Sequence, residues 1–333
     1  MQVFYTSPWV PPEWIKAHGL EPRGIWGAGE PKPLPLTAGS CSFAEAAVRL
    51  AETNPDAAFV FSTHCDQLRR GFDAAVAGPA PARLFLFNLP ATWQTPVAER
   101  IFASELDRLG RFLVGLGGRP PTAEALGETM SRYRLARTRL LGAAAHLPAR
   151  QYCQALAQFH WDGTVNLPES RAVPEPAGKS DAIPLAVVGG PLPPWQGQVL
   201  DAIENAGGRV VLNATEAGER SLGAAVSPEQ APVAAGSLPE LVRLQARSCL
   251  DHCVDVFQRP NTRLYAWLGE RLAVRKARGI VLWHFVGCDL WSAEAQSLRE
   301  AFGLPLLVLN ASEAAGDGPR QVGRIQAFLE SLR

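Results

Sequence analysis

Two stretches of this 333-residue chain end a strand-like apolar run with a thiol. The run 59–62 leads to Cys65-Asp66, the run 279–287 leads to Cys288-Asp289, and a helical pattern follows each pair. A cysteine just past the carboxyl end of a strand lies where α/β proteins usually bind ligands. The positive end of the next helix favours a thiolate at such a position. Each half of the chain therefore offers one candidate functional thiol.

A third cysteine, Cys41, stands just before a predicted helix over 43–52. If the two halves of the chain face each other across a cleft, Cys41, Cys65 and Cys288 can converge. Soft thiolates suit zinc or iron–sulfur clusters. Three ligands spread over the whole chain differ from the local CxxC pairs of structural zinc modules. The spacing leaves a second interpretation open, in which these cysteines are buried and apolar in character.

The remaining cysteines lie within helical patterns. Cys249 and Cys253 are four residues apart and share one helix face, where they could bind metal or support a second cluster. We expect them to be packing residues instead. Cys153 falls on the apolar face of a short predicted helix, and the sequence assigns it no role.

A histidine lies close to each Cys-Asp pair, His64 before Cys65 and His284 before Cys288. Both are candidate catalytic proton donors, or hydrogen-bond donors to cluster sulfur. A structural histidine at a strand end is the alternative. The aspartates that follow the cysteines are equally compatible with helix capping and with catalysis.

The composition describes a globular protein, with 47% hydrophobic and 19% charged residues. The 32 basic residues balance the 32 acidic ones, so we expect neither nucleic acid nor an anionic membrane as a partner. The sequence has no apolar segment long enough to span a bilayer, and its start lacks a secretory pattern. Six cysteines are too few for a disulfide scaffold. We expect a cytoplasmic protein.

Strand and helix alternate in both halves, which predicts an α/β fold of two doubly wound parallel-sheet domains, Rossmann- or flavodoxin-like, with a helical connection. Predicted strands cover 24–27, 59–62, 83–90, 184–190, 208–213, 279–287 and 304–310, and predicted helices cover 13–18, 43–52, 97–116, 122–145, 151–160, 196–206, 238–257, 262–277, 293–302 and 320–332. A Pro/Gly/Ser-rich linker over 168–180 divides an N-terminal domain, 1–165, with Cys41 and Cys65, from a C-terminal domain, 181–333, with Cys288.

Two further observations concern charged residues and missing motifs. We expect Arg132, Arg134, Arg137 and Arg139 to form a solvated basic face of the helix 122–145. The sequence lacks GxGxxG, GxxxxGK[ST], GxSxG and HExxH patterns. ATP or NAD binding by this chain itself is therefore disfavoured.

Several short motifs occur in an order that is typical of one family. They are Pro12-Glu13, 17–22, Cys65-Asp66 with Arg69-Arg70, Leu89-Pro90, the arginine helix 132–139, 189–193, Glu216-x-Gly218-x-Arg220, Cys288-Asp289 and 323–330. In these motifs the chain resembles a subunit of the 2-hydroxyacyl-CoA dehydratase and benzoyl-CoA reductase family over nearly its full length.

The resemblance implies a [4Fe-4S] cluster held by Cys41, Cys65 and Cys288, with one iron open for water or a substrate carbonyl oxygen. It implies a lyase that eliminates water from a 2-hydroxyacyl-CoA through a ketyl radical, after a separate ATP-hydrolysing iron–sulfur activator has delivered one electron. It also implies a heterodimer with a related sister subunit. Candidate contacts to the CoA phosphates are Arg69, Arg70 and Arg220.

Two departures from the family pattern keep alternatives open. The stretch 309–312 is neutral where the family tends to be acidic, and the middle of the chain is short. A benzoyl-CoA reductase-type subunit, a non-catalytic electron relay and a double-cubane cluster protein of the same family are the alternatives.

Overall fold

The computed structural model describes residues 1–29, 40–78, 83–167, 181–226, 233, 236–311 and 317–333. The predicted linker over 168–180 lies outside these residues, and the domain boundary placed there stays a prediction. Of the departures from the family pattern, Ser312 also lies outside them. No helix in the described ranges is both long enough and apolar enough to cross a bilayer.

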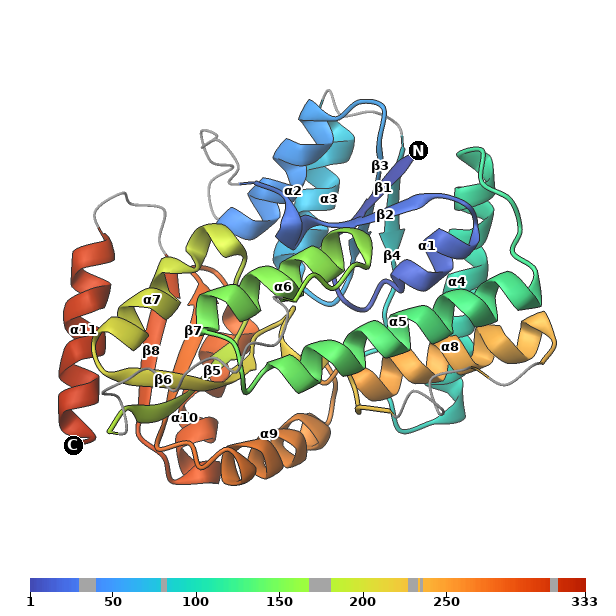
Figure 1. Cartoon of the computed structure of the whole chain (residues 1–333). Coiled ribbons are helices and arrows are strands. Elements are labelled where there is room, and N and C mark those ends of the chain that lie inside the picture. Colours follow the sequence, from blue (N-terminus) through green and yellow to red (C-terminus); the bar gives the residue numbers. More distant parts are fainter. Residues whose placement is uncertain (30–39, 79–82, 168–180, 227–232, 234–235, 312–316) are drawn as a thin grey trace.

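Two four-stranded parallel sheets form the centre of the molecule (Figure 1). The first contains β1 (Gln2–Tyr5), β2 (Glu21–Gly24), β3 (Ala58–Ser62) and β4 (Leu84–Phe87), and the second contains β5 (Ile183–Gly189), β6 (Gly208–Ala214), β7 (Gly279–Phe285) and β8 (Leu306–Ala311). Their strand orders are β2-β1-β3-β4 and β6-β5-β7-β8. In each sheet the first strand along the chain lies between the second and the third, and the fourth lies at the edge. The predicted α/β fold with two parallel sheets is confirmed.

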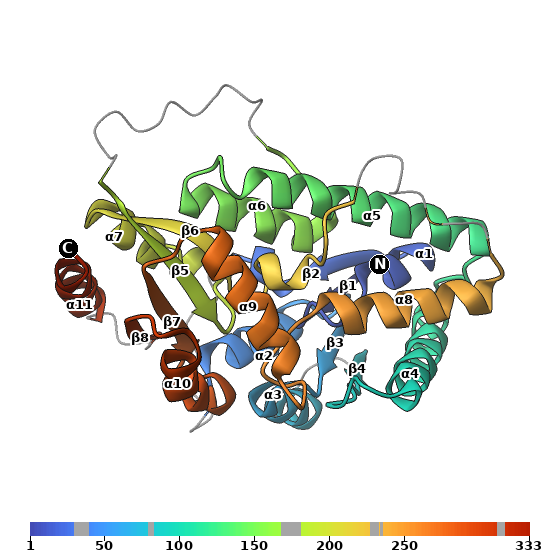
Figure 2. The ribbon, with the colours of Figure 1, turned by 90° about the horizontal axis from the view of Figure 1, so that it is seen from below.

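Helices flank both sheets (Figures 1 and 2). In chain order they are α1 (Pro12–Ala17), the 3-10 turn η1 (Ile25–Gly27), α2 (Ser42–Thr53), α3 (Asp66–Ala77), α4 (Pro96–Gly115), α5 (Ala123–Ala143), α6 (Ala149–Asp162), η2 (Pro194–Gln196), α7 (Gln198–Asn205), η3 (Glu219–Ser221), α8 (Leu238–His252), α9 (Thr262–Val274), α10 (Asp289–Phe302) and α11 (Asp317–Ser331). Helices α2 and α3 pack together against the first sheet, whereas α7 and α11 pack together beside the second.

The second sheet is buried on both faces, and β7 shows why. Ile280 and Leu282 join a core with α9 and α10, while Val281 and Trp283 join the core that includes α7 and α11. Because successive side chains of a strand point to opposite faces, a strand covered on both sides must be apolar throughout. All of β7 is buried, in agreement with its continuous apolar run.

Helix α8 belongs to the second half of the sequence but packs on α4 and α5 of the first half (Figure 1). Its apolar residues Leu241 and Ala246 share one core with Leu106 and Leu109 of α4 and Leu126 of α5. The chain then returns from α8 to the second sheet. The two halves are therefore joined by a packed helical layer as well as by the chain between them.

The strand predicted over 24–27 is wrong. Strand β2 ends at Gly24, and Ile25–Gly27 form the turn η1 against α6. A Cβ atom at Gly24 would lie 2.6 Å from the carbonyl oxygen of His160, and one at Gly27 would lie 2.5 Å from the Cβ of Trp161. The glycines serve a close approach of η1 to α6, which local sequence does not reveal. Strand β1 was not predicted.

Two other predictions are corrected by contacts that are distant in sequence. The helix predicted to run to residue 257 ends at His252, and the backbone N–H of Val254 donates to the carbonyl oxygen of Arg220 instead. Arg137 does not belong to a solvated basic face, because it forms an ion pair with the buried Glu13 of α1. Both predictions were wrong because the residues concerned bind partners that are distant in sequence, Arg220 for Val254 and Glu13 for Arg137.

Candidate metal centre

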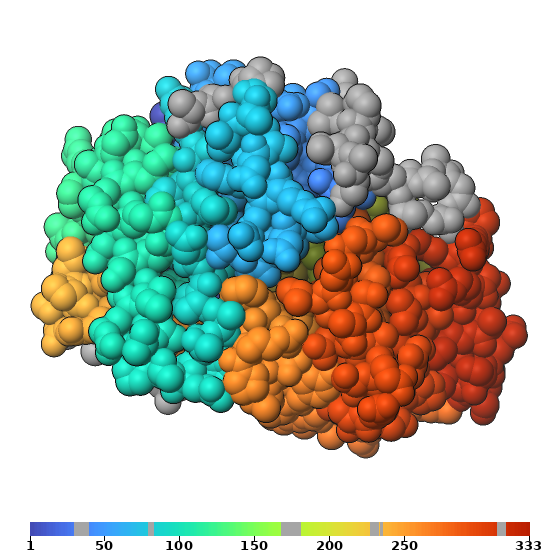
Figure 3. Space-filling model, turned by 180° about the vertical axis from the view of Figure 1, so that it is seen from behind, coloured from blue at the N-terminus to red at the C-terminus, as the bar shows by residue number. Residues whose placement is uncertain are grey.

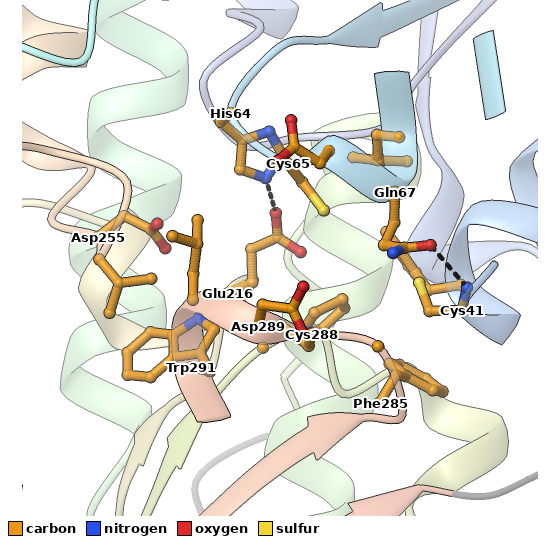
Figure 4. A pocket seen from close by; sticks show the side chains of 18 of the residues that line it. Cys41, His64, Cys65, Gln67, Glu216, Asp255, Phe285, Cys288, Asp289 and Trp291 are labelled. Atoms are coloured by element: carbon orange, nitrogen blue, oxygen red, sulfur yellow. Dashed lines mark hydrogen bonds and ion pairs between the residues drawn. The ribbon is translucent and has the colours of Figure 1, made fainter. Parts of the chain in front are cut away.

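Cys41, Cys65 and Cys288 line one cavity of about 110 Å³ between the carboxyl-end edges of the two sheets (Figure 4). The cavity is lined by Cys41, Phe43, His64, Cys65, Asp66, Gln67, Leu68, Gly190, Pro191, Glu216, Arg220, Asp255, Val256, Phe285, Gly287, Cys288, Asp289, Leu290 and Trp291. One water needs roughly 10–15 Å³, so the space exceeds a hydration site. The structure brings together the three cysteines that the sequence singled out.

The cavity opens at the surface between the amino ends of α3 and α10. Asp66, Gly287 and Asp289 are exposed at this rim, whereas Cys41 is buried deeper, at 7% exposure. On the face shown in Figure 3, α3 in light blue and α10 in orange meet along this seam. The wall beneath the rim is largely apolar and includes Phe285 and Trp291. A bound group would be shielded from water on most sides.

Each of the three cysteines directly precedes a helix: Cys41 stands before α2, Cys65 before α3 and Cys288 before α10. The three thiols make no capping hydrogen bond with these helices. The nearby first-turn N–H groups still oppose, in part, the effect of burial on the pKa of each thiol. Helix amino ends carry a partial positive charge. Three of them converge on this cavity, which suits an anionic group.

Burial outweighs the helix ends in setting the acidity of these thiols. It raises the pKa of Cys41 to about 11 and that of Cys288 to about 12, and it raises the pKa of Cys65 further. The charge of the Cys41 thiolate adds to the shift at both other cysteines. The expected thiolates are therefore protonated at neutral pH in the protein alone. Binding of a metal centre must displace these protons.

A hydrogen-bonded chain of three side chains reaches the cavity wall from the first sheet. The Oγ of Ser62 lies 2.8 Å from Nδ1 of His64, and Nε2 of His64 lies 2.8 Å from Oε1 of Glu216. Glu216 follows β6, so this chain also links the two sheets. The Oε2 atom of Glu216 is buried and has no hydrogen-bond partner in the described part of the chain.

Gln67 connects the loops that carry the cysteines. Its Oε1 accepts a hydrogen bond of 3.1 Å from the backbone N–H of Cys41. A Cβ atom at Gly287 would lie 3.5 Å from the Gln67 Nε2, so the amide side chain stands beside the Cys288 loop. Gly287 has a φ of +83°, a conformation that glycine adopts without strain. The turn before Cys288 therefore depends on this glycine.

Arg220 also lines the cavity, but its guanidinium is occupied. Buried at 3% exposure, it forms an ion pair with Asp255 and donates to the carbonyl oxygens of Gly189, Ala214 and Val254. Its charge lies 5.1 Å from the centre of the Trp291 ring, within cation–π range. The arginine thus ties together the ends of β5 and β6 and the first turn of α10.

Arg69, Arg70 and His284 were also singled out from the sequence, but they do not line the cavity. Arg69 and Arg70 are exposed on α3, and Arg69 forms an ion pair of 3.1 Å with Asp66 at the rim. His284 is buried, with Nδ1 3.0 Å from the carbonyl oxygen of Phe285 and, within the described residues, no partner for Nε2. The guanidinium groups at the rim are exposed to solvent, and the ring of His284 is not.

Cys153, Cys249 and Cys253 are buried in the protein core. The thiols of Cys153 and Cys253 donate to the carbonyl oxygens of Leu192 and Pro8, and Cys249 accepts from Gln245. None of the three lines the cavity. Their protein partners agree with the expected packing role.

Sequence reasoning did not assign roles to Glu216, Asp255 or Gln67. Glu216 belongs to the Glu216-x-Gly218-x-Arg220 motif, which follows β6 at the same sheet edge as the cysteines. This position after a strand was the signal by which the sequence could have identified Glu216 as a site residue. Asp255 lies after the end of α8, but the sequence placed it inside the predicted helix 238–257, where an aspartate suggests no site. Gln67 resembled an ordinary residue of a first helical turn.

Over the described ranges, no three His, Cys, Asp or Glu side chains converge as the ligands of one metal ion do. In an iron–sulfur cluster each thiolate binds a different iron, so the sulfurs surround a volume and need not meet at a point. Three thiols around a shielded cavity with convergent helix ends fit such a cluster.

The comparison with protein families gives one match over nearly the whole chain. The model of the family described as 2-hydroxyglutaryl-CoA dehydratase, D-component, matches residues 9–332. No curated protein matches the chain. Because the match spans essentially the whole sequence, the chain belongs to the 2-hydroxyglutaryl-CoA dehydratase D-component family.

Proposed function

We propose that this chain is the iron–sulfur subunit of a radical 2-hydroxyacyl-CoA dehydratase, a lyase that eliminates water from a 2-hydroxyacyl-CoA after one-electron activation. The observation that carries the proposal is the meeting of Cys41, Cys65 and Cys288, each at a helix amino end, around one shielded cavity. The family supports a dehydratase subunit of the lyase type.

Cys41, Cys65 and Cys288 would hold a [4Fe-4S] cluster. When bound, such a cluster supplies a Lewis-acidic iron and a path for one electron. The amino ends of α2, α3 and α10, which follow the three cysteines directly, would stabilise the anionic thiolates. Phe285 and Trp291 would keep bulk water from the centre.

His64 and His284 differ in what they can contribute to proton transfer. His64 hydrogen-bonds to Ser62 and Glu216, and the His64–Glu216 pair can hold one proton between Nε2 and Oε1 inside the cavity wall. His284 has an Nε2 without a partner among the described residues, but it does not line the cavity. We therefore assign proton holding to the His64–Glu216 pair and a supporting role to His284.

The proposal includes partners. A related sister subunit would complete a heterodimer, as the D-component family implies for a dehydratase complex. A separate ATP-dependent iron–sulfur activator would deliver the electron, and an acyl-CoA would enter at the rim near Asp66 and Asp289. Arg69 and Arg70 stand close to that rim on α3 and are the candidates for CoA phosphate contact. Arg220 would have a structural role and would not contact the CoA phosphates, because protein acceptors already occupy its guanidinium donors.

The test is anaerobic purification followed by iron and sulfide determination and by electron paramagnetic resonance (EPR) of the reduced protein. We expect iron and sulfide in equal amounts and a cluster signal that exposure to air destroys. Titration with 2-hydroxyacyl-CoA should then change that signal. An anaerobically prepared chain without iron would overturn the proposal.

One observation favours a second candidate, an electron relay of the same family. The cavity of about 110 Å³ is small for a cluster together with an acyl group. In a relay subunit the cluster would pass electrons without meeting substrate. A cluster signal that no acyl-CoA alters would favour the relay, whereas a change specific to one acyl-CoA class would favour the dehydratase.

A further inference from the structure

Glu216 presents an unpartnered carboxylate oxygen to the cavity that the three cysteines line. The residue is 5% exposed, and its Oε2 is buried without a hydrogen-bond partner in the described ranges. A buried carboxylate oxygen without a donor is costly, so its presence indicates a cation or a hydrogen-bond donor in the assembled site. Figure 4 shows this carboxylate between the Cys65 and Cys288 sides of the cavity.

We propose that the Glu216 carboxylate is the fourth, non-cysteine ligand of the cluster in the substrate-free protein. This inference rests on the proposed function, because it requires a cluster on Cys41, Cys65 and Cys288. Three cysteines leave one iron without a protein ligand. Glu216 reaches the same cavity from the end of β6 and completes the set from an element that carries no cysteine.

The contacts of the other oxygen support this role. Oε1 of Glu216 accepts from Nε2 of His64 at 2.8 Å, and His64 is held in turn by Ser62. Carboxylates that bind metals are typically hydrogen-bonded at the oxygen that faces away from the metal, which fixes their orientation. The His64 contact therefore holds the carboxylate while Oε2 stays available.

The other carboxylates at the cavity are accounted for. Asp255 pairs with Arg220 and also accepts from the backbone N–H of Phe257. Asp66 is 83% exposed in its side chain and pairs with Arg69. Asp289 is exposed at the rim. Among the lining carboxylates, Glu216 alone combines burial with an oxygen that has no partner in the described residues.

The lining cation does not neutralise Glu216. Arg220 is the lining residue with a permanent positive charge, and its hydrogen bonds go to Asp255 and to backbone carbonyl oxygens. The Oε2 atom of Glu216 therefore remains available to a group that enters the site, and an iron of the cluster would be such a group.

The experiment compares the wild-type chain with Glu216→Gln, Glu216→Ala and the control Asp66→Asn, all purified anaerobically with ⁵⁷Fe. Asp66→Asn removes the same charge from the same cavity at an exposed position. Mössbauer spectra report the unique iron, and electron–nuclear double resonance in H₂¹⁷O reports bound water. Iron and sulfide contents show whether each variant holds a cluster.

We expect the wild type and Asp66→Asn to show no ¹⁷O coupling and one unique iron site with shared parameters. Both Glu216 variants should bind iron, acquire ¹⁷O coupling from water and shift the unique iron. Coupling to water in the wild type, or an unchanged unique iron in both Glu216 variants, would overturn the inference and leave the three-cysteine cluster standing. A wild type without iron would instead remove the proposed function.

Discussion

Cys65 and Cys288 occupy equivalent positions in the two halves of the molecule. Each follows the third strand of a parallel sheet, β3 or β7, and each stands directly before the helix that comes next. Because the two sheets share one strand order, the carboxyl ends of β3 and β7 can face each other across the cavity. Cys41 has no cysteine counterpart in the second half, so the two halves contribute unequal numbers of thiols to the cavity.

Serine substitutions should separate the three cavity cysteines from the three core cysteines. Cys41→Ser, Cys65→Ser and Cys288→Ser should each lower the iron content of anaerobic protein severalfold, because serine is a poor iron–sulfur ligand. Cys153→Ser is the matched buried control and should keep its iron. Iron determination and EPR provide the measurement. Equal iron in all four variants would contradict the assignment.

Breaking the buried ion pair Arg220–Asp255 should lower the free energy of unfolding substantially. Asp255→Asn leaves a guanidinium buried without its counterion, and we expect unfolding to become easier by about 3 kcal/mol. The control is Asp201→Asn, which disrupts the part-exposed pair Arg150–Asp201 and should cost less than about 1 kcal/mol. Urea unfolding of both variants tests the difference, and similar losses would speak against a structural role for Arg220.

Alanine at Gly287 should disturb the centre beyond its effect on stability. Gly287 and Gly19 both have positive φ, +83° and +79°, and a Cβ atom at either would meet no severe clash. Gly287→Ala and Gly19→Ala should therefore each destabilise the fold by about 1 kcal/mol. Only Gly287→Ala should also weaken iron retention during a challenge with a chelator. Equal retention in the two variants would show that the Cys288 turn tolerates strain.

Acid should destabilise the protein partly through His160. Burial, with a smaller effect of Arg137, lowers the pKa of His160 to about 3. An unfolded histidine titrates near about 6.5, so between these values the unfolded chain binds a proton that the folded chain does not. Stability should fall as pH decreases through this window, by on the order of 1–2 kcal/mol at pH near 5.

The variant His160→Gln removes this titration and should flatten the dependence of unfolding free energy on pH between about 6.5 and 4. The half-buried His252, whose pKa is lowered to about 4 mainly by desolvation, should retain part of the slope. His146→Gln changes an exposed histidine and should leave the profile as in the wild type. A variant His160→Gln with the full slope would exclude this histidine as a source.

The sequence predicted those parts of the centre that depend on local pattern. Cys65 and Cys288 were recognisable because an apolar strand, a thiol and a helix follow one another within a few residues. Glu216 was not assigned, because its partner His64 is 152 residues away and its free oxygen exists only in three dimensions. The turn at 24–27 was misassigned for the same reason, since its glycines are needed for the close approach to α6.

The acidity of the thiols shows a second limit of the sequence. Helix amino ends were expected to favour thiolates at Cys41 and Cys65, and the structure does supply those ends. Burial nevertheless raises the pKa of both groups. The depth of a side chain depends on the whole fold, so local sequence predicts the direction of the helix effect but not the net result.

Helix α8 makes the two sheets mechanically dependent on each other. A fragment that begins at residue 181 would carry α8 without α4 and α5, and would expose Leu241 and Ala246 to water. Removing either half therefore strips part of the other half's core. We expect the sheets to melt in one cooperative transition, so that the cavity persists as long as the chain stays folded.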